Sequence, residues 1–175
     1  TFKGTGQTSS LAYHYSGNTI WPVSVSRSFG EGPQTTLFTL DRYDERGNLL
    51  QSTDPNGIST TYLWGYGGTR LVAEIRNAAY QQVANVLGQA RIDAMTDRIT
   101  LSESDIAALE GLRSAAALGD TQITTYTHHP IFGVTSRTDP RGVRTSYLYD
   151  ETGRIKEIAD DAGNPVVAYD YKYRK

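Results

Sequence analysis

The sequence predicts a mainly β protein in which antiparallel β-hairpin repeats form a twisted sheet, with one helical insertion. Eleven residues occur twice, at an offset of 85: Asp54–Trp64 reads DPNGISTTYLW and Asp139–Tyr149 reads DPRGVRTSYLY. Six of these positions are identical and three more are conservatively changed. Each copy begins with a turn motif and continues into alternating residues, so a structural unit recurs. Between the copies lies a stretch rich in Ala, Leu, Gln and Arg, which predicts helix.

The composition fits one folded domain and excludes several functional classes. The chain has 175 residues, of which 38% are hydrophobic and 21% charged, and it has no apolar run long enough to span a bilayer. A net charge of −2, with 17 basic and 19 acidic residues, provides no footprint for nucleic acid. The absence of cysteine excludes disulfides and thiolate zinc sites. Because it opens at Thr1 without a leader, the chain is expected to be a segment of a longer protein.

Tyr-Asp turns form the first repeated element. Tyr43–Leu49 reads YDERGNL, and Tyr149–Ile155 repeats the pattern as YDETGRI, 106 residues later. The aspartate can accept backbone N–H bonds two residues on, and the glycine tolerates the left-handed conformation that closes a short hairpin. We therefore expect positive φ at four turn glycines, Gly47, Gly57, Gly142 and Gly153.

Asp-Pro turns form the second element, and strands fill the gaps. These turns are Asp54–Gly57 and Asp139–Gly142, with Ala162–Asn164 at the matching place in the last copy. One strand face is aromatic and is expected to pack against a second layer; it carries Ile58, Thr60, Tyr62 and Trp64 in the first copy and Val143, Thr145, Tyr147 and Tyr149 in the second. The other face carries Ser59, Thr61 and Leu63. The C-terminal run extends the alternation with Val167, Tyr169, Tyr171 and Tyr173.

The stretch from about Ala73 to Asp120 predicts two helices. Asn77 is the expected N-cap of the first, over Ala78–Leu87, which Gly88 would end. A capping-box variant at Ser102–Asp105 opens the second, over Ser102–Leu118, with an apolar stripe of Ile106, Leu109, Leu112 and Ala116, ended by Gly119. Ile92, Met95 and Ile99 are assigned to a connecting turn.

These motifs together resemble the RHS/YD-repeat family. The resemblance covers residues 43–66 and 125–173. The run TYLWGY at Thr61–Tyr66, a helical insert, and then TTY at Thr124–Tyr126 and PIFGVTS at Pro130–Ser136 are similar to a subgroup found in large Bacteroidetes surface and secreted proteins. The whole chain, 1–175, is interpreted as one module: leading strands at 1–42, first repeat hairpins at 43–69, a helical insertion at 70–120 and further repeats at 121–175.

The resemblance implies a sheet of hairpins that spirals into a hollow shell, with C-terminal cargo that is often a toxin, or a cell-surface role. The implied location is extracellular or at the cell surface, and the implied partners are neighbouring repeats, with toxin cargo or a surface glycan as further alternatives. Because about three repeats cannot close a shell, the sheet edges should seek partners, and weak self-association is expected.

The sequence predicts no catalytic, cofactor-binding or metal-binding residues. Asp54 and Asp139 resemble the aspartate motif of self-cleaving RHS shells, but they lie 85 residues apart in separate turns and no Leu follows the glycine. His128 and His129 would point to opposite faces of a strand, which disfavours a metal site that also includes His14. The Asp150–Gly153 turn lacks the ligand spacing of a calcium loop, and Gly65–Gly68 lacks the residues of a phosphate loop.

Two functional classes therefore remain, and an enzyme is a weak third. The first is a non-enzymatic structural module that packs against neighbouring repeats. The second is a carbohydrate- or peptide-binding surface that uses exposed Tyr and Trp side chains. A solvent-facing cluster of Trp21, Trp64 and Tyr66 would favour binding, whereas burial of these rings would favour the structural role.

Overall fold

The computed structural model describes residues 9–17 and 19–172, which form a mainly β fold with a three-helix insertion. Eleven antiparallel strands make one sheet, in which the order of the strands follows the sequence. The strands are β1 (Ser9–His14), β2 (Ser24–Phe29), β3 (Thr35–Tyr43), β4 (Leu49–Thr53), β5 (Ser59–Gly65), β6 (Arg70–Arg76), β7 (Gln122–His129), β8 (Gly133–Thr138), β9 (Arg144–Tyr149), β10 (Ile155–Ala159) and β11 (Pro165–Ala168). The predicted fold class is confirmed.

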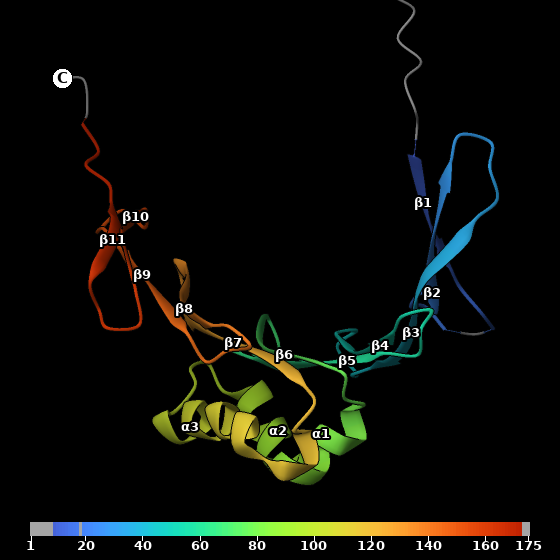
Figure 1. Cartoon of the computed structure of the whole chain (residues 1–175), viewed down its shortest axis with the longest axis horizontal. Helices are drawn as coiled ribbons and strands as arrows, with labels where there is room; N and C mark the ends of the chain where they lie inside the picture. Colours follow the sequence, from blue (N-terminus) through green and yellow to red (C-terminus); the bar gives the residue numbers. More distant parts are fainter. Residues whose placement is uncertain (1–8, 18, 173–175) are drawn as a thin grey trace, which may run out of the picture.

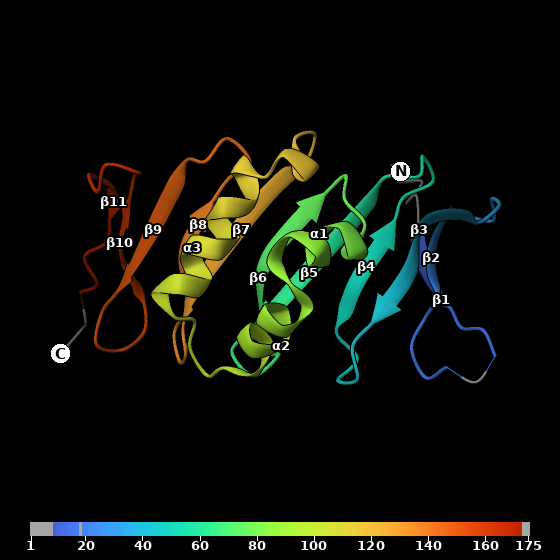
Figure 2. The same cartoon turned by 90° about the horizontal axis from the view of Figure 1, so that it is seen from below.

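The sheet is strongly curved, and all the helices lie on its convex face. Figure 1 shows both ends of the sheet, β1–β3 and β9–β11, rising away from the helices, so the opposite face is concave. Seen from the helical side in Figure 2, the helices cover the middle strands and leave both ends of the sheet bare. Six of the strand pairs carry a register shift, and such bulges bend and twist strands.

The helical insertion begins after β6 rather than at residue 70 or Ala73, because Arg70–Arg76 pair with both β5 and β7. It comprises α1 (Tyr80–Leu87), α2 (Gln89–Asp97), α3 (Glu103–Gly111) and two short 3₁₀ turns, η1 (Leu112–Ser114) and η2 (Ala116–Leu118). None of the helices among the described residues has the length and apolar character that a membrane crossing requires.

The start of α1 differs from the prediction. Asn77 does not cap this helix, because it adopts φ 66° and its side-chain amide donates to the Asp120 carbonyl (3.1 Å), which ties the two ends of the insertion together. Ala79 occupies the N-cap position instead, and its free N–H donates to the Gln82 side chain (2.8 Å). Gly88, at φ 84°, ends α1 as predicted.

The segment assigned to a connecting turn is helix α2. It starts directly after Gly88 and buries Ile92 and Met95, whereas Ile99 lies beyond its end and is exposed. The sequence does not predict this helix, because it has no N-cap side chain and no marked apolar stripe. Its stability therefore comes from packing against β5, which local propensity does not report.

The capping box at the start of α3 is confirmed: Ser102 accepts from the Asp105 N–H, and the Asp105 side chain accepts from the Ser102 N–H. However, α3 ends at Gly111, a poor helix former, instead of reaching Leu118. Ala116 is consequently exposed, and Leu118 in the second 3₁₀ turn takes the buried position.

The hydrophobic core lies between the helices and the convex face of β5–β7. Thr61 and Leu63 on this face are fully buried, and the Thr61 hydroxyl donates to the Ala78 carbonyl (2.9 Å). The prediction that the aromatic stripe packs against the second layer is wrong for β5, because Tyr62 lies on the opposite, concave face. There its hydroxyl contacts the Ser52 hydroxyl (3.1 Å). The other core residues are Val72, Ala73, Ile75, Ala78, Tyr80, Val83, Ala84, Ile92, Met95, Leu109, Leu112, Leu118 and Ile123.

The C-terminal strand is shorter than its alternating sequence suggests. β11 ends at Ala168, and Tyr169 and Tyr171 follow outside the sheet with their rings stacked (centroids 6.2 Å apart). The Tyr171 hydroxyl donates to the Ile155 carbonyl (2.8 Å), which holds this segment back against β10. Tyr173 lies outside the described residues.

Candidate functional site

Five hairpin turns of the sheet share one hydrogen-bond pattern, which begins at Asp44, Asp54, Asp139, Asp150 and Asp160. In each turn the aspartate N–H donates to the carbonyl of the fifth residue at 2.8 to 3.0 Å, and the N–H of the glycine at position four donates to the aspartate carbonyl at 2.9 to 3.1 Å. The carboxylate Oδ1 accepts from the N–H of the fifth residue at 2.8 to 3.0 Å. The Tyr-Asp and Asp-Pro motifs therefore build the same turn.

The turn glycines adopt the predicted backbone conformation. Gly47, Gly57, Gly142 and Gly153 have φ between 80° and 86°, and Gly163 in the last turn has φ 81°. This left-handed region is open to glycine at little cost, whereas other residues are strained there.

The hydrogen bonds accepted by the carboxylates of Asp139, Asp150 and Asp160 lower the pKa of each of these three side chains. The pKa of Asp139 lies below its ordinary value chiefly because of the backbone N–H of Val143, and that of Asp150 because of the Thr152 side chain and the backbone N–H of Arg154. The turns at Asp54 and Asp139 are four strands apart in the sheet, about 19 Å at the usual strand spacing. The structure therefore does not bring these two carboxylates together as a pair that shares a proton.

The two Tyr-Asp turns lie at the same end of the strands, where they alternate with three other connections. We call this row of five connections the spine. It joins β1 to β2, β3 to β4, β5 to β6, β7 to β8 and β9 to β10, and it consists of residues 15–17 and 19–23, 44–48, 66–69, 130–132 and 150–154. The remaining connections, including the helical insertion, lie at the opposite ends of the strands.

An aromatic ring from one spine turn sits on the glycine of the next Tyr-Asp turn. Trp21 stacks on Tyr43 (centroids 5.4 Å apart), and its indole fills the space where a Cβ on Gly47 would lie, 2.7 Å from Nε1. The Tyr43 hydroxyl in turn donates to the Pro22 carbonyl (2.8 Å). The first spine turn is thus fastened to the second by ring stacking and a hydrogen bond.

The second Tyr-Asp turn repeats this arrangement with different residues. Phe132 lies 5.8 Å from Tyr149, and its ring occupies the Cβ position of Gly153, 2.8 Å from Cδ1. The Tyr149 hydroxyl donates to the Val134 carbonyl (2.7 Å). Trp21 precedes its tyrosine by 22 residues and Phe132 by 17, so no constant spacing in the sequence reveals the shared role.

Polar contacts complete the spine between these two aromatic joints. The side-chain amide of Asn48, the fifth residue of its turn, donates to the Gly68 carbonyl (2.9 Å). Tyr66 accepts a hydrogen bond from the backbone N–H of His128 (2.9 Å). Beyond the last turn, the Arg154 guanidinium lies over the Tyr171 ring (4.1 Å to its centroid). Each turn of the spine therefore contacts either the next turn or, in the case of Tyr66, the end of strand β7 that leads into the next turn.

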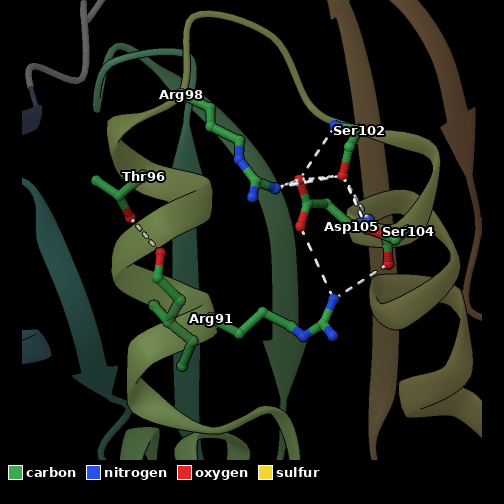
Figure 3. A network of polar contacts seen from close by, with 7 residues as sticks. Arg91, Thr96, Arg98, Ser102, Ser104 and Asp105 are labelled. Carbon is green, nitrogen blue, oxygen red and sulfur yellow. Dashed lines mark hydrogen bonds and ion pairs between the residues drawn. The ribbon is translucent and has the colours of Figure 1, made fainter.

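A buried carboxylate fastens α2 to α3 (Figure 3). Asp105 is 2% exposed and accepts from the Ser102 hydroxyl (2.7 Å) and from the Arg98 guanidinium, while Arg91 lies 3.8 Å away. Burial opposes its ionisation, but the bonds from Ser102 and Arg98 outweigh burial and lower its pKa. The capping-box pattern identifies Ser102 and Asp105, whereas nothing in the sequence identifies the two arginines as partners.

The three histidines occupy separate environments. His128 bonds through Nε2 to the Leu71 carbonyl (2.8 Å), and His129 stacks on Phe132 (4.4 Å) in the next turn. His14 pairs with the Ser26 hydroxyl (2.6 Å) at the far end of the sheet. Within the described ranges, no group of three or more His, Asp or Glu side chains is placed to hold a metal ion.

The rings of Trp21, Trp64 and Tyr66 do not gather into one solvent-facing cluster. Trp21 belongs to the first spine joint, the Trp64 indole donates to the Leu49 carbonyl (2.8 Å), and Tyr66 packs against the core. Gly65–Gly68, weighed as a phosphate loop, ends β5 and turns into β6, with positive φ at Tyr66, Gly67 and Gly68.

Comparison with known proteins agrees with this repeat geometry. The family model described as RHS Repeat matches residues 43–82 and 133–165, and no curated protein matches the chain. Each matched segment contains one Tyr-Asp turn and the strand that follows it, β4 in the first segment and β10 in the second. RHS repeats are in general structural modules without catalytic residues. The two matched segments are thus similar to RHS repeats.

Proposed function

We propose that this chain is a non-enzymatic structural module, a curved length of wall in a larger shell or in a secreted or cell-surface protein. The observation that carries the proposal is the continuous spine. Its aromatic rings, which a binding surface would present to solvent, are used in contacts between successive turns. Such nearest-neighbour contacts are how repeat proteins stabilise an extended structure.

The two open ends of the sheet are the proposed contacts with neighbouring repeats. Exposed apolar side chains collect there: Leu11, Tyr13, Phe29 and Phe38 at one end, and Val166, Val167, Tyr169 and Tyr171 at the other. Unpaired edge strands readily accept another strand. Further repeats with the same curvature would enclose a space on the concave side, and in this proposal that space holds cargo such as a toxin. An extracellular location and membership of the Bacteroidetes-type subgroup belong to the same proposal.

An added repeat tests the structural role. Residues 139–165, which contain three of the Asp turns, can be appended after Lys175, with the same residues in shuffled order as the matched control. If β11 accepts a neighbouring repeat, the extended chain should gain β signal in circular dichroism and should unfold at a higher urea concentration than the control. Equal unfolding midpoints for the two extensions would contradict the proposal.

A groove on the convex face is where the alternative, carbohydrate or peptide binding, would act. It has a volume of about 700 Å³ beside α2, and its walls include Tyr43, Trp64 and Gln89. The Arg46–Asp97 ion pair (2.6 Å) joins the β3–β4 turn to α2 at this groove. To test this alternative, the labelled chain is applied to a glycan array and to a peptide array, and we expect no specific binding. Binding that Trp64→Ala abolishes would instead favour the carbohydrate- or peptide-binding role.

A further inference from the structure

The ladder between β6 and β7 stops before the strands end. Its last pair toward the spine is Ala73 with Thr125, although both strands continue in that direction, to Arg70 and to His129. Backbone groups beyond the last ladder pair need other partners. Two side chains supply them.

Tyr66 and His128 replace the missing ladder bonds. The Nε2 of His128 lies 2.8 Å from the Leu71 carbonyl of β6, and the Tyr66 hydroxyl accepts the backbone N–H of His128 at 2.9 Å. The two rings meet edge to face, with centroids 5.3 Å apart. We call this arrangement the Tyr66–His128 joint.

The joint is also connected to the helical insertion. Tyr66 packs against the core and adopts φ 56°, a conformation that costs a non-glycine residue energy and that its surroundings must maintain. The next residue, Gly67, donates its N–H to the Arg98 carbonyl just past α2 (2.8 Å). Loss of the His128 contacts would therefore affect the β5–β6 turn, strand β6 and the helical insertion together.

Only one nitrogen of His128 is satisfied. Because a carbonyl can only accept, Nε2 carries the proton in the bond to Leu71, and Nδ1 is the unprotonated nitrogen. Nδ1 is buried and has no hydrogen-bond partner among the described residues. Protonation would place a charge at this atom with no acceptor beside it.

The surroundings of His128 oppose that charge. Burial lowers the pKa of His128 most, and the positive charge of Arg70 on β6 lowers it further, while the bond to Leu71 acts in the opposite direction. From the β5–β6 turn the facing group is the Tyr66 phenol, whose own pKa is raised by burial, so it is neutral in this pH range. On β7 itself, the neighbouring His129 stacks on Phe132.

We propose that His128 is an acid-sensitive latch: its protonation opens the Tyr66–His128 joint and frees the β5–β6 turn from β7. This inference goes beyond the structural role, because it assigns the sheet one contact, the Tyr66–His128 joint, that mild acid weakens. Opening lets water solvate Nδ1, so the open form binds the proton more tightly than the closed form. By linkage the closed form loses stability as the pH falls below the ordinary histidine pKa of about 6.5.

Hydrogen exchange read by mass spectrometry tests the latch directly. Peptides covering residues 66–71 and 126–129 should exchange faster at pH 5.0 than at pH 7.5, after correction for the intrinsic effect of pH, while core peptides of β5 should not. A tenfold rise in the opening constant corresponds to one unit of difference in pKa between the closed and open forms. Equal corrected rates at the two pH values in 66–71 and 126–129 would overturn the proposal.

His128→Gln and His129→Gln provide the matched variants. A glutamine amide can still donate to Leu71 but does not titrate in this range, so His128→Gln should lose most of the difference in exchange between the two pH values. His129→Gln should retain that difference. Should His128→Gln fail to fold, an NMR titration of the His128 ring in the unmodified chain decides: a pKa below 6.5 supports the latch, and a pKa of 6.5 or above refutes it.

Discussion

The glycines at position four of the turns allow the energetic contribution of the spine to be measured. Gly142 and Gly153 have nearly the same backbone conformation, with φ 83° and 80°, but different surroundings. A Cβ on Gly142 would meet nothing within 4 Å, whereas a Cβ on Gly153 would lie 2.8 Å from Phe132. Alanine at the two positions therefore introduces the same backbone strain but only one steric conflict.

The expected cost follows from these two contributions. Left-handed backbone costs an L-residue about 1 to 2 kcal/mol, so Gly142→Ala should lower the free energy of unfolding by about that amount. In Gly153→Ala the Phe132 ring must move away from Tyr149 and from its stack on His129, and such aromatic contacts contribute about 1 kcal/mol. Gly153→Ala should thus cost about 2 to 3 kcal/mol.

Urea unfolding followed by circular dichroism measures both variants, and melting temperature provides a second reading, at roughly 2 to 4 °C per kcal/mol for a chain of this size. Phe132→Ala serves as the control background, because Gly153→Ala made in it should cost no more than Gly142→Ala. If Gly153→Ala costs no more than Gly142→Ala in the otherwise unmodified chain, the ring of Phe132 does not fasten the spine and our reasoning is wrong.

Four further predictions concern separate parts of the molecule. Asp105→Ala should lower the free energy of unfolding by about 2 kcal/mol in urea, less than for a fully buried pair because the arginines are half exposed. Light scattering over a hundredfold concentration range should detect weak self-association, which Val166→Lys on edge strand β11 should abolish; a monomer throughout would show that this edge is closed. Intact mass should stay constant for days between pH 5 and 8, and Asp139→Asn should change nothing, whereas fragments ending near Pro140 would reveal self-cleavage. Since its hydrogen bonds lower the pKa of Asp150, the stability they provide is complete above the unfolded value of 3.8 and is lost as the pH falls below it; Asp150→Asn should flatten this acid limb in a titration followed by fluorescence.

The structure also refines the choice of control for self-association. The sequence alone indicates Tyr171→Lys, because Tyr171 falls in the alternating C-terminal run. In the fold Tyr171 lies beyond β11, donates to the Ile155 carbonyl and lies under Arg154, so its replacement would also loosen the end of the sheet. Val166 lies within the edge strand and is exposed, and it makes the cleaner substitution.

The sequence by itself determined the features that depend on neighbouring residues. An aspartate and a glycine three positions apart close the five turns through bonds that span at most five residues, so the motif is sufficient to predict both the hairpins and the positive φ of the glycines. The capping box at Ser102 and the stop at Gly88 are local for the same reason. The order of turns along the chain then implied an antiparallel sheet with an insertion.

Only the tertiary structure decided which distant residues meet. Tyr66 and His128 are 62 residues apart and Asn48 and Gly68 are 20 apart, and their contacts depend on sheet register, bulges and twist rather than on a local pattern. The same factors placed the helices over Thr61 and Leu63 instead of the aromatic face and made a helix of the segment with Ile92 and Met95. Helix α2 is stabilised by contact with β5, and the spine by contacts between segments that are distant in the sequence. Because these contacts form only in the folded sheet, no local sequence pattern predicts either feature.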